Sequence, residues 1–225
     1  MNQAWLQDPD RLWHTTGLGR EEFVQRLLST LVFGHARHRW NTPGPPSERG
    51  REYLSGLAGE YLGGLSVFEA QFVDEFELPR RHDDELAGWP DQAVIAREAL
   101  LLIELETEQR SHRPGQVAHY LDLAVHHHPD RNISLLYLTP TMPVPKPHPL
   151  PDQARYAHGT WREVAPLIVD TWGDSPVNWE RRIGRAAGLV ARGDRSTAAP
   201  ASSPTHQRTS RDTRHSGVGH RGGAA

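Results

Sequence analysis

The sequence predicts an α/β protein in which helices pack on a mixed central sheet, and three observations lead to this prediction. Apolar residues recur at helical spacing in several segments, other short runs are rich in valine, leucine and aromatic residues, and the two kinds of segment alternate along the 225-residue chain. The length is sufficient for one domain with short extensions. We therefore expect one folded domain over residues 1–192.

Two helices are expected at the start of this domain. The segment 20–33 has apolar residues at helical spacing, and Glu21 and Glu22 in its first turn suit the helix dipole. Ser47 is a suitable N-cap for a second helix, which Gly63 and Gly64 should end. Both helices precede the segments that have the character of strands.

Four strands and three further helices are expected after these two. The alternating or apolar runs form a three-stranded meander followed, beyond a helix, by one more strand. The expected strands cover 67–78, 92–97, 99–107 and 133–139, and the expected helices cover about 114–127, 161–169 and 179–190. This order gives a mixed sheet with helices on its faces.

The last part of the chain differs in composition. From Gly193 onward it is rich in Arg, Ser and Gly and has no periodic apolar positions, so we expect residues 193–225 to be a disordered tail. Five arginines and two aspartates give this tail a charge of +3, which leaves −6 for residues 1–192 of the total of −3. An acidic domain counts against a broad basic surface for binding nucleic acid without sequence preference.

Composition also excludes several classes of protein. No run of 18 apolar residues is present and the first residues lack the pattern of a signal peptide, so we expect a cytoplasmic protein with no membrane partner. The absence of cysteine excludes disulfides, thiolate metal sites and a cysteine nucleophile. Protein partners are not indicated by the sequence.

Three acidic residues carry the functional prediction. If the second and third predicted strands form a hairpin with a two-residue turn at Arg97–Glu98, their pairing places Asp91 opposite Glu104. Glu106 lies on the same face as Glu104, because side chains repeat every two residues along a strand. The three carboxylates are therefore expected to converge at one end of the sheet.

Such a cluster needs a proton or a cation, because neighbouring carboxylates cannot all stay ionised without cost. Oxygen ligands favour a hard divalent ion, so Mg²⁺ or Mn²⁺ is the expected cofactor. The alternative is a longer turn with a different register, in which the acids only mark where the strand leaves the core. The spacing leaves both open, since Arg-Glu is not a favoured pair for a tight turn.

The same region resembles the PD-(D/E)xK nuclease superfamily. Pro90-Asp91, then twelve residues, then Glu104-Leu105-Glu106 is similar to its bipartite motif. Gln116 and Tyr120 are similar to the QxxxY helix of the RecB-like and λ-exonuclease-like branches. The resemblance covers about residues 47–140 and implies a restriction-endonuclease-like fold, in which helices flank a mixed central sheet.

The resemblance also implies a role for each residue of the motif. Asp91 and Glu104 would hold the metal, and the main-chain carbonyl of Leu105 would be a further ligand. Glu106 stands where the superfamily usually has lysine. Some members have glutamate there, and in them it is taken as a metal ligand or a general base.

Helical residues complete the expected site. Gln116 and Tyr120 are four residues apart and share one helix face. The resemblance implies that they position substrate, whereas the alternative is a surface pair without a function. The resemblance also implies an extra acid from a helix before the strands, for which Glu60 on the second predicted helix is the expected metal ligand; its alternative is a solvated charge.

The carboxylate cluster and the resemblance together predict a divalent-metal-dependent nuclease that hydrolyses phosphodiester bonds. The resemblance implies DNA as the partner. The rival hypothesis is a catalytically inactive nuclease-like scaffold that serves as a nucleic-acid- or protein-binding module. The acidic domain and Glu106 favour the rival. The presence of Asp91, Glu104, Gln116 and Tyr120 favours the enzyme.

Overall fold

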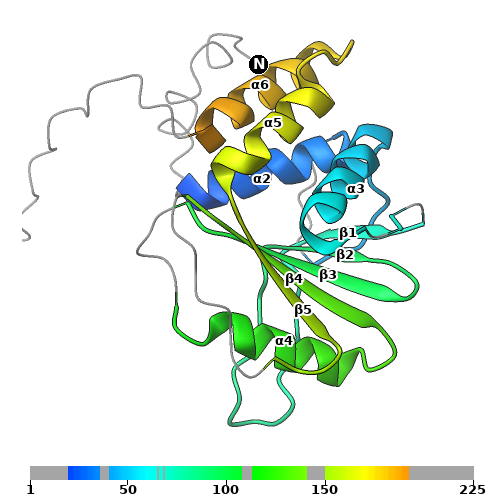
Figure 1. The fold of residues 1–225 in the computed structure, drawn as a ribbon, viewed down its shortest axis with the longest axis vertical. Coiled ribbons are helices and arrows are strands. Elements are labelled where there is room, and N and C mark those ends of the chain that lie inside the picture. Colours follow the sequence, from blue (N-terminus) through cyan, green and yellow to red (C-terminus); the bar gives the residue numbers. More distant parts are fainter. Residues whose placement is uncertain are drawn as a thin grey trace, which may run out of the picture. The chain divides into compact units, whose positions relative to one another are not determined.

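The structure is a computed structural model that describes residues 20–35, 41–64, 66–67, 69–107, 113–140 and 150–192 (Figure 1). All of them belong to a compact unit that spans Met1–Asp194. The tail expected over residues 193–225 lies outside the described residues.

Five strands form one mixed sheet in the order β1-β2-β3-β4-β5. The first three, β1 (Gln71–Asp74), β2 (Gln92–Ile95) and β3 (Ala99–Leu105), pair antiparallel as the expected meander. The other two, β4 (Asn132–Thr139) and β5 (Ala154–Thr160), continue the sheet in parallel with β3. The predicted α/β class with a mixed central sheet is confirmed.

Helices cover both faces of this sheet (Figure 1). The helix α4 (Gln116–His127) packs on one face and encloses a core with residues such as Leu102 and Leu135. The opposite face is covered by α2 (Arg20–Phe33), α3 (Glu48–Leu62), α5 (Trp161–Trp172) and α6 (Asn178–Arg192). None of the described helices is long and apolar enough to cross a membrane.

Local chemistry explains where the helices begin and end. The Ser47 side chain accepts a hydrogen bond from the Gly50 N–H at the start of α3, and Gly63 ends that helix in the left-handed conformation with φ 73°. At α5, Thr160 and Glu163 form a capping box. The predicted bounds of α2 and α3 are confirmed.

Two strands differ from the prediction. The run over 67–78 forms a strand only at Gln71–Asp74, because Glu75 has a left-handed φ of 52° and interrupts the extended chain. Further along, Leu78 forms only an isolated β-bridge with Gly88. The strand β5 was not expected from the sequence.

Candidate functional site

The β2–β3 hairpin has the predicted register. Gln92 pairs with Ile103, and the Ala96 N–H donates to the Ala99 carbonyl across the turn at 2.9 Å. The next pair beyond the strand is therefore Asp91 and Glu104. The Asp91 N–H donates to Glu104 Oε2 at 3.3 Å, and the adjacent Leu105 N–H donates to Asp91 Oδ2 at 2.7 Å.

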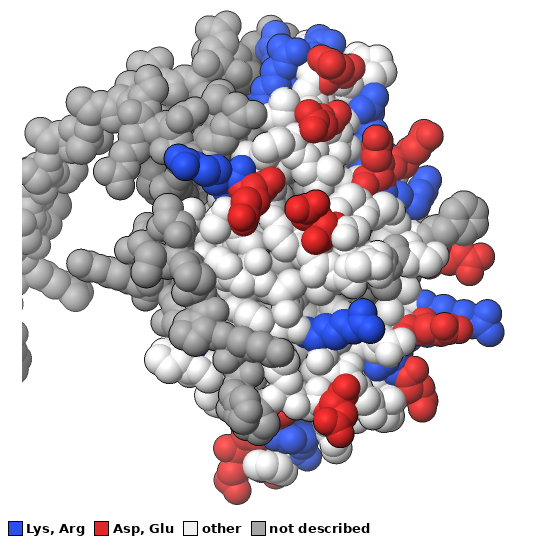
Figure 2. Space-filling view, viewed as in Figure 1, with Lys and Arg blue, Asp and Glu red and all other residues white. Residues whose placement is uncertain are grey.

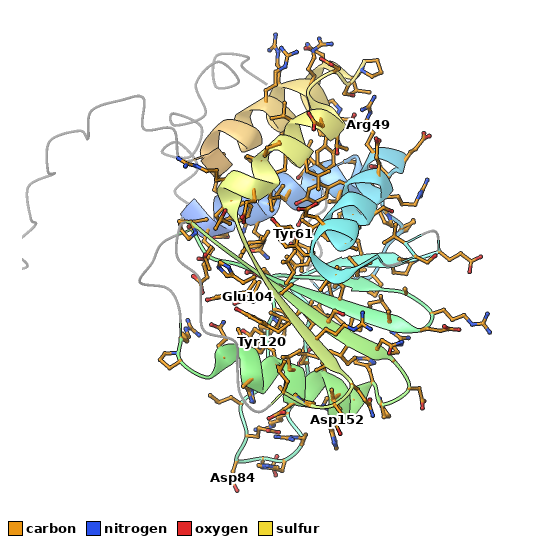
Figure 3. All side chains as sticks on the ribbon, in the orientation of Figure 1. Arg49, Tyr61, Asp84, Glu104, Tyr120 and Asp152 are labelled. Carbon is orange, nitrogen blue, oxygen red and sulfur yellow. The ribbon has the colours of Figure 1, made fainter. Side chains whose placement is uncertain are left out.

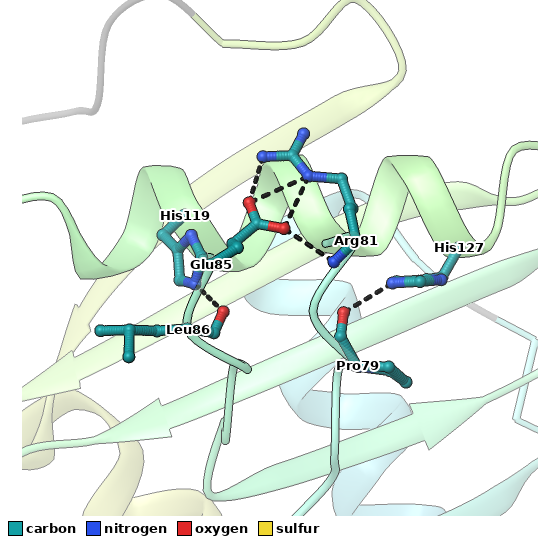
Figure 4. A network of polar contacts seen from close by, with 6 residues as sticks. All are labelled: Pro79, Arg81, Glu85, Leu86, His119 and His127. Carbon is teal, nitrogen blue, oxygen red and sulfur yellow. Dashed lines mark hydrogen bonds and ion pairs between the residues drawn. The ribbon is translucent and has the colours of Figure 1, made fainter. Parts of the chain in front are cut away.

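The segment that leads into Asp91 is fixed to α4. Two histidines of α4 hold it (Figure 4): His119 Nε2 bonds to the Leu86 carbonyl at 2.9 Å, and His127 Nε2 to the Pro79 carbonyl at 2.6 Å. Within the segment, Arg81 and Glu85 form an ion pair. Since a carbonyl can only accept, each histidine Nε2 is the donor. The path of the chain toward Asp91 is thus set by α4.

Helix α4 also supplies the two polar residues expected on it. Gln116 Nε2 donates to Glu104 Oε1 at 2.6 Å and is 3.0 Å from the Tyr120 hydroxyl. In Figure 3 Glu104 lies at the end of the sheet with Tyr120 beside it on the α4 side. The structure therefore brings Gln116 and Tyr120 to the carboxylates.

Glu106 follows the last residue of β3 and is 4% exposed. Its Oε1 accepts a hydrogen bond from the Tyr137 hydroxyl at 3.0 Å, and its carbonyl accepts one from Trp161 Nε1 at 2.7 Å. Its N–H donates to the Leu138 carbonyl at 2.8 Å. The residue is therefore held through its main chain and through one side-chain oxygen.

The surroundings of Asp91 and Glu104 disfavour the ionised form of both carboxylates. Burial raises the pKa of Asp91 well above its usual range; the Leu105 N–H opposes this, and Glu21, Glu106 and Asp74 add to the rise. Burial, then Asp91 and Glu106, raises the pKa of Glu104 in the same way. Among the described residues, no cation contributes to either shift.

The helical acid that acts on this cluster is Glu21 of α2. Its Oε2 accepts a hydrogen bond from the Thr107 N–H at 3.4 Å, and its charge raises the pKa of both Asp91 and Glu104. Glu60 instead lies exposed on α3, where its charge acts on Tyr61. The structure does not bring Glu60 to the carboxylates. The only sequence signal for Glu21 was its place in the first turn of a helix.

A buried polar network supports Asp91 from the other face of the sheet. Gln25 of α2, 3% exposed, donates through Nε2 to Asp74 Oδ1 at 3.2 Å and to the Asp91 carbonyl at 3.1 Å. Ser29 Oγ donates to the same Asp74 oxygen at 2.7 Å and accepts from Gln92 Nε2 at 3.0 Å. These bonds tie α2 to the ends of β1 and β2.

In the part of the chain that the structure describes, three buried side-chain oxygens in and beside the cluster have no hydrogen-bond partner. Glu106 Oε2 and Gln116 Oε1 are buried without a hydrogen-bond partner, and so is the Thr107 hydroxyl. A buried acceptor without a donor is costly, so such atoms mark a place for a donor, a water or a cation. All the side-chain atoms are oxygens, which suits Mg²⁺ or Mn²⁺.

The donor set thus fits a hard cation in its chemistry, but it does not form a ready coordination sphere. Over the described ranges, no three His, Asp or Glu side chains are arranged to hold a metal ion. Asp91 and Glu104 bond instead to neighbouring N–H groups. Leu105 turns its side chain into the core, and a role for its carbonyl stays a prediction.

A pocket of about 500 Å³ lies elsewhere, at the opposite end of the strands. It is lined by the β2–β3 turn, the end of α3 and the first residues of β4, and it contains none of the predicted site residues. On the face seen in Figure 2, the described basic and acidic side chains are interspersed. Neither feature extends the carboxylate cluster.

Comparison of the chain with protein-family models, curated proteins and solved structures finds no match. The assignment of a function therefore depends on the geometry of the cluster.

Proposed function

We propose that this protein is a divalent-metal-dependent nuclease that hydrolyses phosphodiester bonds, with DNA as its substrate. The observation that carries the proposal is the convergence of Asp91, Glu104 and Glu106 on one face of the sheet end, with no cation among the described charges that act on Asp91 and Glu104. The resemblance to PD-(D/E)xK nucleases rests on these same residues, and the restriction-endonuclease-like version of the fold is part of the proposal.

The residues of the cluster would have separate roles in metal binding and in positioning. Asp91, Glu104 and Glu106 would hold Mg²⁺ or Mn²⁺, which supplies charge neutralisation at the phosphoryl group and activation of water. Glu106 Oε2 is an oxygen free to act as a ligand or to take a proton. Gln116 orients Glu104, and Tyr120 stays a neutral phenol because burial, with the Glu104 charge adding to it, raises its pKa to about 12.

A second candidate function is supported by a different observation. Because Asp91 and Glu104 already accept hydrogen bonds from main-chain N–H groups, the cluster is satisfied in part without a metal. This favours a catalytically inactive scaffold that binds nucleic acid or protein. Glu106 in the usual position of lysine favours it as well.

Cleavage assays on single- and double-stranded DNA, with RNA in parallel, test the proposal. We expect cleavage by the full-length wild type with Mg²⁺ or Mn²⁺ and none with EDTA. Asp91→Asn and Glu106→Ala should remove most of it, while Gln116→Ala, which loses a contact to a ligand, should lose about 10–100-fold. Glu98→Gln, an exposed acid in the turn, is the matched control.

Two results would support the scaffold instead. One is a wild type that neither cleaves nucleic acid nor binds a divalent ion by calorimetry. The other is an inactive wild type beside a Glu106→Lys variant that gains cleavage, since that would mean that the site lost its activity with its lysine.

A further inference from the structure

The environment of Glu106 fixes which of its atoms can meet a ligand. Two donors hold it from different elements: the Tyr137 hydroxyl of β4 bonds to side-chain Oε1, and Trp161 Nε1 of α5 bonds to the carbonyl. Oε2 is buried and has no partner. One carboxylate oxygen is therefore occupied and the other is left free.

Both donors are themselves held firmly. Tyr137 is 0% exposed and Trp161 is 4% exposed, so packing restricts the rotation of their rings. An indole N–H can only donate. Burial, with the nearby Glu106 charge adding to it, raises the pKa of Tyr137, which keeps its hydroxyl protonated as a donor at neutral pH.

We infer that Tyr137 and Trp161 are positioning residues that hold Glu106 so that Oε2 alone is presented to a divalent cation. This inference depends on the proposed function, because it assumes a cation at the cluster. Tyr137 sets the rotation of the carboxylate, and Trp161 fixes the main chain just beyond β3. Partners that fix the orientation of a metal ligand typically change affinity about 10–100-fold when removed.

The two residues should differ in their dependence on the side chain at 106. The Tyr137 bond requires an acceptor there, whereas the Trp161 bond is made to the main chain and persists with any side chain. Removing the Tyr137 hydroxyl should therefore lower the affinity for the cation only while Glu106 is present. Removing the Trp161 indole N–H should loosen position 106 whatever residue it carries.

Calorimetric titration of the full-length protein with Mn²⁺ tests this without any need for cleavage. We expect Tyr137→Phe and Trp161→Phe each to weaken binding about 10–100-fold. The matched controls are Tyr53→Phe and Trp172→Phe, which alter buried rings in the core that also contains Trp161; of these three described rings, only that of Trp161 bonds to Glu106. The Trp172 indole nitrogen has no hydrogen-bond partner, so its loss should leave Mn²⁺ affinity unchanged.

A double-mutant cycle separates positioning from general damage to the fold. In a Glu106→Ala background, Tyr137→Phe should cause no further loss of Mn²⁺ affinity, because its acceptor is gone. Wild type that binds Mn²⁺ beside a Tyr137→Phe variant of equal affinity would overturn the inference and leave the proposed function standing. Equal additional loss in the Glu106→Ala background would also overturn it. A wild type that binds no Mn²⁺ would instead refute the proposed function.

Discussion

Neutralising Glu106 should make the metal-free protein more stable. Glu104 and Glu106 are two residues apart on an extended chain, so about 6.6 Å separates their Cα atoms. Two charges at that distance repel by about 2.5 kcal/mol at an effective dielectric constant of about 20. The raised pKa of Glu104 means that its ionised form is disfavoured, so this figure is an upper bound. We expect Glu106→Gln to gain about 1–2 kcal/mol at pH 8.

The assay is thermal unfolding in EDTA. For a chain of this size a gain of 1 kcal/mol raises the melting temperature by about 2–4 °C, so the variant should melt about 2–8 °C higher. The gain should shrink as the pH falls, because protonation of Glu104 removes the repulsion. Glutamine still offers an oxygen to the Tyr137 hydroxyl, so that contact is retained.

Glu180→Gln is a matched control with the opposite expectation. Glu180 is also buried, but it accepts a hydrogen bond from Ser175 and lies 3.9 Å from Arg49 Nε. Neutralising it should lower stability, because it removes a partner of a cation. A Glu106→Gln variant that melts at or below the wild-type temperature at pH 8 would refute the claim that Glu104 and Glu106 repel each other in the folded protein.

Two further predictions concern pH and packing. The pKa values of Asp91 and Glu104 are raised above 3.8 and 4.5, so at these two residues the folded state binds more protons than the unfolded one above about pH 4. In EDTA the free energy of unfolding should therefore fall as the pH rises from there. Urea unfolding at pH 5 and 8 measures this change, and a higher free energy of unfolding at pH 8 would contradict the prediction. Gly50→Ala should cost about 1–3 kcal/mol, since its Cβ would lie 2.1 Å from the Val32 carbonyl oxygen. Gly59→Ala on the same helix meets nothing within 4 Å and should gain up to about 1 kcal/mol, so melts of equal temperature for these two variants would contradict the packing argument.

The parts of the site that follow from pairing could be predicted from the sequence. The register of β2 and β3 depends on one turn, and the turn at Arg97–Glu98 fixes Asp91 beside Glu104. The Gln116–Tyr120 pair followed in the same way from helical spacing. Both are local relations, in which separation along the chain determines separation in space.

Relations between distant segments could not be predicted. Nothing near Glu21 indicates that the first turn of α2 lies beside Thr107, 86 residues further on. The strand β5 has a polar, partly exposed sequence, and its extended form depends on pairing with β4. Trp161 directly follows β5, so the contact of Trp161 with Glu106 could not be predicted from the sequence either.

The Gln25 side chain bears on how this protein can be divided. Its amide joins Asp74 to the Asp91 carbonyl from a helix that precedes the motif, while Trp161 reaches Glu106 from a helix that follows it. A fragment cut to the span of the recognisable motif, about residues 47–140, would therefore keep the carboxylates but lose contacts from both sides. The smallest unit worth expressing, grafting or fusing to another domain runs from before α2 to the end of α6, which also contributes to the core.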